Sequence, residues 1–228
     1  MIRKNAKRAG MFVLILAAGY LVIGYIFHLL IFPEKRPDVS TYFKPGHQFY
    51  SKAEGVLQTV VKQENGHVYC STIMEPHAGG PPEHIHTSFD ETFEVSNGEL
   101  SLLVDGKVVK LKPGQTFNIP KGTPHKPFNE TADTLRLKGT IAFPEKFAFH
   151  LAQIYGVMDN DLNFGKSAGT ILQMSLIGSY GFDSYLADGP PVPMQKATSF
   201  MLTPLARWCG YKSFYPEYDI RKKEVVKL

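Results

Sequence analysis

The segment from residue 79 to residue 129 constrains the fold most, because it carries four side chains that can bind a metal ion at fixed spacings. His84 and His86 lie two residues apart, so on an extended strand both imidazoles point to the same face. Glu91 follows five residues later, on what we expect to be the next strand, and Gly98 closes that strand in a turn. The first half of the segment therefore predicts two successive strands with metal-binding side chains.

The second half of the segment has its own regular spacing and contains the fourth of these side chains. Five residues separate Gly114 from Pro120, and one residue separates Pro120 from Gly122. Two more residues lead to His125, and three more lead to Asn129. We expect the turn before His125, which is rich in proline and glycine, to direct its side chain inward.

These two spacings resemble the two sequence motifs of the cupin family. The first motif, G-x5-H-x-H-x3–4-E-x6-G, fits the residues from His84 to Gly98. The leading glycine of this motif is not matched, because Gly79 lies one residue too close to His84 and Ala78 occupies the position expected for glycine. The second motif, G-x5-P-x-G-x2-H-x3-N, is matched at every fixed position of residues 114–129.

The resemblance covers roughly residues 66–141 and implies both a fold and a metal site. The implied fold is a double-stranded β-helix, a jelly-roll barrel in a mainly β chain. The implied site holds a divalent transition metal ion through His84, His86, Glu91 and His125. Three neutral imidazoles and one carboxylate suit Fe, Mn, Ni, Cu, Co or Zn. An ion with four protein ligands can keep one or two positions for water, dioxygen or a substrate oxygen.

Other side chains near the motifs fit either a binding site or ordinary structure. Strand parity places four apolar side chains inside the barrel, as pocket lining or simply as core: Phe93, Val95, Phe117 and Ile119. His77, Glu83 and Asp90 flank the motifs and are explained more simply as solvated loop residues than as acids or bases. We assign Asn129 to a turn or to the residues that support the ligands, and not to the ligand set. Catalytic residues stay unassigned, because the sequence shows no evident nucleophile or triad.

Turn signals at short intervals predict the remaining strands of the barrel, which we place at residues 46–143. Asn65-Gly66 and Asp105-Gly106 each separate two strand-like runs and are typical two-residue hairpin tips. A closing strand is expected at residues 135–141, where apolar and charged residues alternate.

A long apolar run near the N-terminus predicts a membrane anchor. Residues 11–32 are 22 residues without Asp, Glu, Lys or Arg. A helix of this length spans about 33 Å, which is enough for a bilayer core. We therefore predict a transmembrane helix at residues 11–32, followed by a linker at residues 33–45. A cleaved signal peptide is the less favoured alternative, because the run is long for one and no small-residue cleavage site follows it.

The distribution of charge predicts the orientation of this helix. The first ten residues carry a net charge of +4, whereas Glu34, Lys35 and Arg36 after the helix sum to +1. Basic residues stay preferentially on the cytoplasmic side, so residues 1–10 would be a cytoplasmic tail and the barrel would lie outside the cytoplasm. In a bacterium that location is the periplasm.

The remaining composition narrows the choice of partners. The last ten residues carry +2, so the body between the termini carries −2 and has no basic stripe for nucleic acid. Cys70 and Cys209 are too few for a disulfide framework, and we expect Cys70 simply to be buried. A small-molecule ligand or substrate is the expected partner, and a homodimer is left open.

The spacing of apolar residues changes at residue 144 from that of strands to that of helices. This change predicts a helical extension over residues 144–228. Helices are expected from Pro144-Glu145 to about Gly156, over residues 167–177 and over residues 194–209. The third helix has a polar side with Lys196, Ser199, Thr203 and Arg207, and an apolar side with Met194, Ala197, Met201, Leu205 and Trp208. The favoured interpretation packs the apolar side against the barrel or neighbouring helices. The alternative places it on the membrane surface.

The sequence as a whole favours a membrane-anchored, metal-dependent enzyme acting on a small organic molecule. An oxygenase-like oxidoreductase is the first choice of reaction and an isomerase the second. The resemblance defines a class of site and no reaction, because one fold hosts many functions. The alternative is a non-catalytic extracytoplasmic ligand-binding or sensor module that uses the same pocket. A scaffold barrel without metal is the third possibility.

Overall fold

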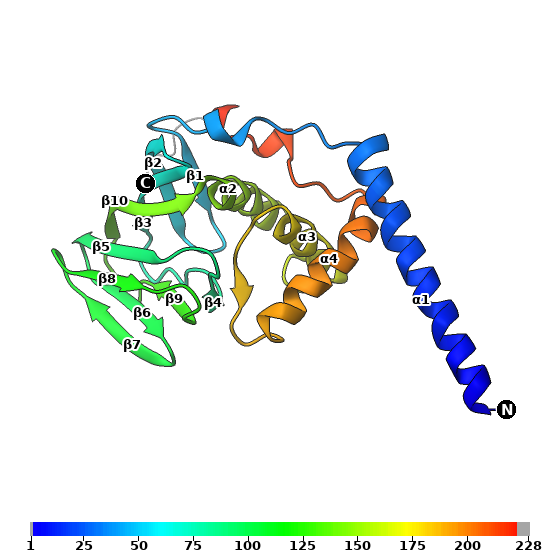
Figure 1. Ribbon diagram of the computed structural model, residues 1–228. Coiled ribbons are helices and arrows are strands. Elements are labelled where there is room, and N and C mark those ends of the chain that lie inside the picture. The colour runs from blue at the N-terminus through cyan, green and yellow to red at the C-terminus, as the bar shows by residue number, and fades with distance from the viewer. Residues whose placement is uncertain (1, 223–228) are drawn as a thin grey trace.

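The computed structural model describes residues 2–222, which form a β-barrel, a group of helices beside it and a long N-terminal helix that projects away (Figure 1). Within these residues one sheet has six strands in the order β1-β2-β3-β10-β5-β8, and the other has five in the order β11-β4-β9-β6-β7. The strands pair antiparallel. The prediction of a mainly β jelly-roll with helices at both ends is confirmed.

The strands of the first sheet are β1 (Gln48–Ser51), β2 (Val56–Glu64), β3 (His67–Met74), β10 (Leu135–Pro144), β5 (Glu91–Asn97) and β8 (Thr116–Ile119). Those of the second are β11 (Tyr185–Leu186), β4 (His84–Ile85), β9 (His125–Phe128), β6 (Leu100–Val104) and β7 (Lys107–Leu111). The helices are α1 (Ile2–Ile26), α2 (Glu145–Asn160), α3 (Ala168–Ser179) and α4 (Val192–Trp208). Short helical turns lie at Phe27–Ile31, Val39–Thr41, Pro216–Tyr218 and Ile220–Lys222.

Both predicted hairpins are present. Asn65 and Asp105 adopt left-handed φ angles of 52° and 46° at the two tips, as two-residue hairpin turns require. β2 pairs with β3 across the first tip, and β6 pairs with β7 across the second. The closing strand β10 extends to Pro144, three residues past its expected end, and joins β3 to β5.

The hydrophobic core runs from the barrel into α2. Buried and half-buried residues alternate along β3, as expected for a strand with one face inward. Phe147, Phe149 and Tyr155 of α2 are buried in the same cluster as barrel residues such as Val95. Cys70 of β3 is buried as expected and is not bonded to Cys209. The first C-terminal helix is therefore part of the barrel's own core.

α2 begins at the expected residue but continues four residues past Gly156, its expected end. A Cβ at Gly156 would lie 2.3 Å from Cγ of Tyr218, so this glycine makes room for the tyrosine ring. The glycine therefore serves close packing and is not a helix stop. α3 and α4 begin and end within two residues of their predicted limits.

The favoured interpretation of α4, in which its apolar side is buried, is wrong. Met194, Met201 and Trp208 are 59%, 54% and 54% exposed. Thr203 and Ala206, which are buried, lie on its other side, and the buried Pro204 packs against Gly24 of α1. Thr203 Oγ1 lies 2.7 Å from Ser179 Oγ of α3. Small side chains on this side let α3 pack closely, which leaves the large apolar residues facing outward.

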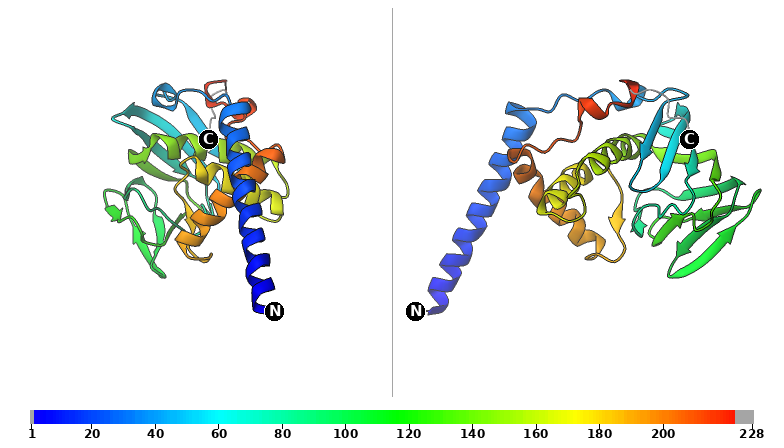
Figure 2. Two further views of the ribbon diagram at one scale, coloured as in Figure 1. Left: turned by 45° about the vertical axis from the view of Figure 1, so that its right-hand side comes forward. Right: turned by 180° about the vertical axis from the view of Figure 1, so that it is seen from behind.

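α1 begins at Ile2, nine residues before the predicted start of the apolar helix, so the described part of the expected tail is also helical. It continues into a π-helical turn at Phe27–Ile31. By length and composition the stretch Asn5–Ile31 could cross a membrane, and little of it is buried within the described structure. Figure 2 shows its N-terminal half standing clear of the other elements.

Gly80, in the loop that leads to β4, tests how closely the chain packs there. Its φ is 62°, and a Cβ would lie 2.0 Å from the carbonyl oxygen of Pro127. We expect Gly80→Ala to lower the free energy of unfolding by roughly 2–4 kcal/mol, because left-handed strain and a backbone clash add. Gly106→Ala is the control, since its φ is 73° but the space around it is open; about 1 kcal/mol is expected. Denaturation of the full chain in detergent, followed by circular dichroism, compares them, and equal losses would contradict the clash.

Candidate metal centre

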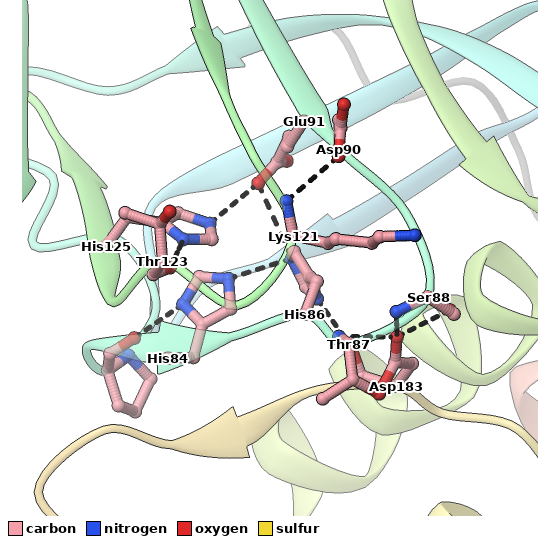
Figure 3. A network of polar contacts seen from close by, with 11 residues as sticks. His84, His86, Thr87, Ser88, Asp90, Glu91, Lys121, Thr123, His125 and Asp183 are labelled. Atoms are coloured by element: carbon pink, nitrogen blue, oxygen red, sulfur yellow. Dashed lines mark hydrogen bonds and ion pairs between the residues drawn. The ribbon is translucent and has the colours of Figure 1, made fainter.

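The four side chains singled out by the sequence motifs lie together inside the barrel (Figure 3). Potential ligand atoms of His84, His86, Glu91 and His125 all lie within 4.8 Å of one another, and all four residues are buried. They come from β4, the residue just after it, and the starts of β5 and β9. The structure thus brings together every residue that the sequence analysis placed at the metal.

Strand pairing explains this convergence. His84 of β4 is paired with His125 of β9, and Glu91 at the start of β5 is paired with Ile119 of β8. β4 spans two residues, so His86 lies just past its end. Its Nε2 nevertheless lies 3.2 Å from Nε2 of His84, which agrees with the two rings sharing one face. Glu91 Oε2 lies 2.9 Å from His125 Nε2 and 3.5 Å from His86 Nε2.

The second nitrogen of each ring is held by a backbone carbonyl. His84 Nδ1 lies 2.9 Å from the oxygen of Pro82, and His125 Nδ1 lies 2.9 Å from that of Thr123. His86 Nδ1 lies 2.5 Å from the oxygen of Asp183. A carbonyl oxygen accepts hydrogen bonds and cannot donate them, so each Nδ1 carries the proton and donates it. In the neutral ring the lone pair is then on Nε2, which points into the cluster.

Burial and neighbouring charge set the ionisation of the cluster. Burial, with His86 and His125 nearby, lowers the pKa of His84 to about 3. Burial would raise the pKa of Glu91, but hydrogen bonds from His125 and His86 outweigh it and lower that pKa. Burial likewise opposes charge on His125, yet the hydrogen bond and charge of Glu91 raise its pKa. An ionised Glu91 carboxylate therefore lies beside a neutral His84 ring and favours the protonated form of His125.

This donor set fits a divalent transition metal ion. Three imidazole nitrogens and one carboxylate oxygen are the ligand types that such ions take in proteins. The inward lone pairs repel one another unless a proton or a cation lies between them, and burial disfavours the proton on His84. The carbonyl groups on the outer nitrogens are the usual second partners of metal-binding histidines.

Asp183 belongs to this site and was not predicted from the sequence. Its backbone oxygen accepts from His86, while its carboxylate accepts from Thr87 N and Ser88 N at 2.8 and 2.7 Å. The same carboxylate accepts from the hydroxyl groups of Thr87 and Ser88 at 2.7 and 2.5 Å (Figure 3). Asp183 precedes β11, which pairs with β4. No spacing in the sequence marks it, because it lies 97 residues from His86.

Aromatic rings form one wall of the centre. Phe89 stacks on the ring of His86 with centroids 4.2 Å apart, and Phe147 of α2 meets the same ring edge-on at 5.1 Å. Phe182, next to Asp183, stacks on Phe147 at 5.1 Å. Phe89 and Phe147 therefore cover His86 with apolar surface and keep water from that side, and Phe182 packs behind Phe147.

The other residues considered in the sequence analysis have structural roles. Three of the apolar side chains expected inside the barrel belong to the buried core: Phe93, Val95 and Ile119. The fourth, Phe117, is partly buried and packs against that core. His77, Glu83 and Asp90 lie outside the four-residue cluster, and Asp90 accepts from Lys121 N at 2.9 Å. Asn129 Nδ2 donates to the oxygens of Glu75 and Asp133, both at 2.8 Å, in agreement with a turn role.

The chain is similar to parts of several solved structures. A cupin-2 domain containing protein from Shewanella frigidimarina NCIMB 400 is 25% identical, with 38% of this chain and 78% of that chain covered and a TM-score of 0.33. KdgF from a Halomonas species is 22% identical, with 43% and 86% covered and a TM-score of 0.37.

Sequence comparisons give a family and one curated relative. Residues 71–142 match the family model described as the cupin domain. The chain is also similar to "Probable oxidoreductase virH" of Hypocrea virens (strain Gv29-8 / FGSC 10586), with 26% identity over 197 residues that cover 76% of this chain and 86% of the relative. The matched family segment contains all four clustered side chains. The chain is therefore a cupin-domain protein, and the resemblance seen in its two motifs is confirmed.

Proposed function

We propose that this protein is a membrane-anchored metalloenzyme of the oxidoreductase class, oxygenase-like, that acts on a small organic molecule. The observation that carries the proposal is the common direction of four donor atoms, with each outer Nδ1 bound to a carbonyl. Similarity to a probable oxidoreductase over most of both chains supports the reaction class. When bound, a metal ion supplies Lewis-acid or redox chemistry at the positions its protein ligands leave open.

The residues of the chain itself supply orientation, charge and a dry environment. The carbonyl groups hold the protons on Nδ1, so His84, His86 and His125 keep their Nε2 lone pairs inward. Glu91 contributes one negative charge to the four-ligand set. The rings of Phe89 and Phe147 exclude water on one side, which strengthens the electrostatic interactions inside. Asp183 fixes the backbone of the two residues after His86.

We further propose that α1 anchors the protein in a membrane. Its exposed apolar surface supports this, together with the net charge of +4 in the first ten residues. Residues 1–10 then lie in the cytoplasm and residues 11–32 span the bilayer. The linker of residues 33–45, the barrel of residues 46–143 and the extension of residues 144–228 lie on the other side.

Removal of one histidine tests the metal site. We expect His125→Ala, in protein purified without chelators, to lose bound metal and to bind Zn²⁺ or Co²⁺ more than about 100-fold more weakly, because even outer partners of ligands contribute 10–100-fold. His77→Asn is the control, since it removes an exposed imidazole from outside the cluster, and asparagine tolerates the φ of 57° there. Elemental analysis and metal titration give the readout. Equal metal content in the two variants would show that His125 does not bind the metal.

The role of Asp183 is tested by removing its charge. We expect Asp183→Asn to weaken metal binding by about 10–100-fold, because the segment that holds His86 loses an ionised acceptor of four hydrogen bonds. The electron paramagnetic resonance spectrum of bound Cu²⁺ should also change. Asp188→Asn makes the same charge change at an exposed residue and should alter neither readout. Identical affinities would show that Asp183 does not position the ligand.

Metal affinity should fall as the pH falls. Despite burial, Glu91 raises the pKa of His125 above its usual 6.5, so the metal-free site gains a proton that the ion must displace. His84, with a pKa of about 3, stays neutral and adds no competition near neutrality. Affinity should therefore level off above the pKa of His125 and drop by about tenfold per pH unit below it. Zn²⁺ titrations from about pH 8.5 to about pH 6 measure this, and a flat profile would contradict it.

The reaction class is tested with metal-loaded protein in detergent or vesicles. Oxygen uptake is measured with panels of small organic molecules, and His125→Ala is the inactive reference. Turnover that depends on His125 supports the oxidoreductase. A protein that is inert across the panels, while ligands still shift the spectrum of its bound metal, is instead a binding or sensor module.

A further inference from the structure

α4 presents a continuous apolar stripe that the described residues do not cover. Met194, Met201, Leu205 and Trp208 recur at helical spacing and are 59%, 54%, 38% and 54% exposed. Ala197, on the same side, is also exposed. An apolar stripe of this length on a helix surface marks a contact surface, because a solvated helix normally turns such a face toward a core.

The stripe is fixed next to α1 by an unusual junction. Pro204 cannot donate a hydrogen bond to the carbonyl of Phe200, and the hydroxyl of Tyr25 in α1 donates to that oxygen at 2.8 Å. The hydroxyl of Tyr20 donates to the oxygen of Met201 at 2.8 Å and accepts from Leu205 N at 3.1 Å. Two tyrosines of α1 therefore satisfy backbone groups that the proline leaves open in α4.

Ring contacts continue this junction onto the stripe. Trp208 meets Tyr20 edge-on with centroids 5.6 Å apart. Gly24 brings the two helices together, because a Cβ there would lie 2.5 Å from Pro204 Cβ. Figures 1 and 2 show α1 and α4 meeting near their C-terminal ends and then diverging, with the barrel beyond α4 on the side away from α1. The stripe thus adjoins the apolar surface of α1, of which Leu14 and Leu16 are 67% and 57% exposed.

The charged residues of α4 are engaged elsewhere. Arg207 pairs with Glu34 at 3.3 Å and donates to His28 Nδ1 at 2.7 Å. Lys196 Nζ donates to Thr87 Oγ1 at 3.0 Å. The stripe itself carries no charge, so it suits an apolar partner and does not require an anionic one.

We infer that α4 is an interfacial helix that lies on the bilayer crossed by α1, with its apolar stripe among the upper acyl chains. This inference rests on the proposed anchor, because continuity with α1 identifies lipid as the occupant. Because α4 meets α1 at Tyr20 and Tyr25, the outer boundary of the hydrocarbon then falls near these residues, which shifts the proposed span of residues 11–32 toward Asn5. Trp208 then sits at the membrane–water boundary, where tryptophan is enriched. The helix adds a second contact to the anchor and fixes the orientation of the barrel at the membrane.

Trp208 is the single tryptophan of the chain, so its fluorescence reports directly on the stripe. Full-length protein is placed in neutral phosphatidylcholine vesicles with or without bromine on the upper acyl chains. We expect emission to be lost in the brominated vesicles and to be unaffected by aqueous iodide. Added anionic lipid should not change this result, because the stripe is uncharged.

A probe at the far end of the stripe separates this contact from the contact at α1. Met194→Cys is spin-labelled in a Cys209→Ser background, with Cys70 buried and unreactive. Val108→Cys on β7 is the matched control, because Val108 is 54% exposed and Met194 is 59% exposed. We expect the label at 194 to be more accessible to oxygen than to an aqueous nickel chelate, and the label at 108 to show the reverse.

The outcomes separate the helix from the anchor. Protein that floats with the vesicles while both labels are accessible to the aqueous chelate would overturn the interfacial helix and leave the anchor intact. Protein that does not float would overturn the anchor and this inference with it. Spin–spin broadening at 194 that depends on protein density, without oxygen accessibility, would show that a second copy covers the stripe and would also overturn the inference.

Discussion

The geometry of the candidate metal centre depends on three hydrogen bonds from imidazole Nδ1 groups to backbone carbonyls. Each bond decides which ring nitrogen keeps its lone pair, and together they turn three Nε2 atoms toward Glu91. Two of the carbonyls belong to residues two positions before the histidine they hold, so local chain geometry provides them. The third belongs to Asp183, 97 residues from His86, so folding of the C-terminal part must deliver it.

The C-terminal part of the chain is therefore a component of the site and not an appendage to the barrel. α2 carries Phe147 against the ring of His86, and Phe182 stacks on Phe147. β11 adds a strand beside β4, which carries His84. The family match ends at residue 142, so these contacts lie outside the segment that defines the family. Proteins that share the cupin domain can differ in what encloses the four clustered side chains, which is one physical basis for different chemistry on one fold.

At the junction of α1 with α4, backbone groups left without helical partners by Pro204 bond to side chains of α1. A proline inside a helix leaves a carbonyl without its donor, which is costly when the group is removed from water. The hydroxyl groups of Tyr20 and Tyr25 supply the missing partners, so the helix pair is specified by geometry as well as by apolar contact. From α4 the chain connects back through Lys196 to Thr87, which Asp183 also holds. The element next to the proposed anchor and the loop beside the metal centre thus belong to one connected body.

Sequence alone determined the features that follow from local spacing. The hairpin tips and the barrel class could be predicted because turn residues act over a few positions, and the grouping of the four side chains was implied by the resemblance of the two motifs to the cupin family. Gly156 looked like a helix stop, and its true role required the position of Tyr218. The spacing of apolar residues in α4 predicted that its apolar side would be buried. α3 packs instead on the side with small residues, because small side chains let the two backbones approach more closely. Asp183 could not be predicted either, because its contact with His86 joins residues that lie 97 positions apart. Tertiary structure alone decided these points, because contacts between distant segments leave no periodic trace in the chain.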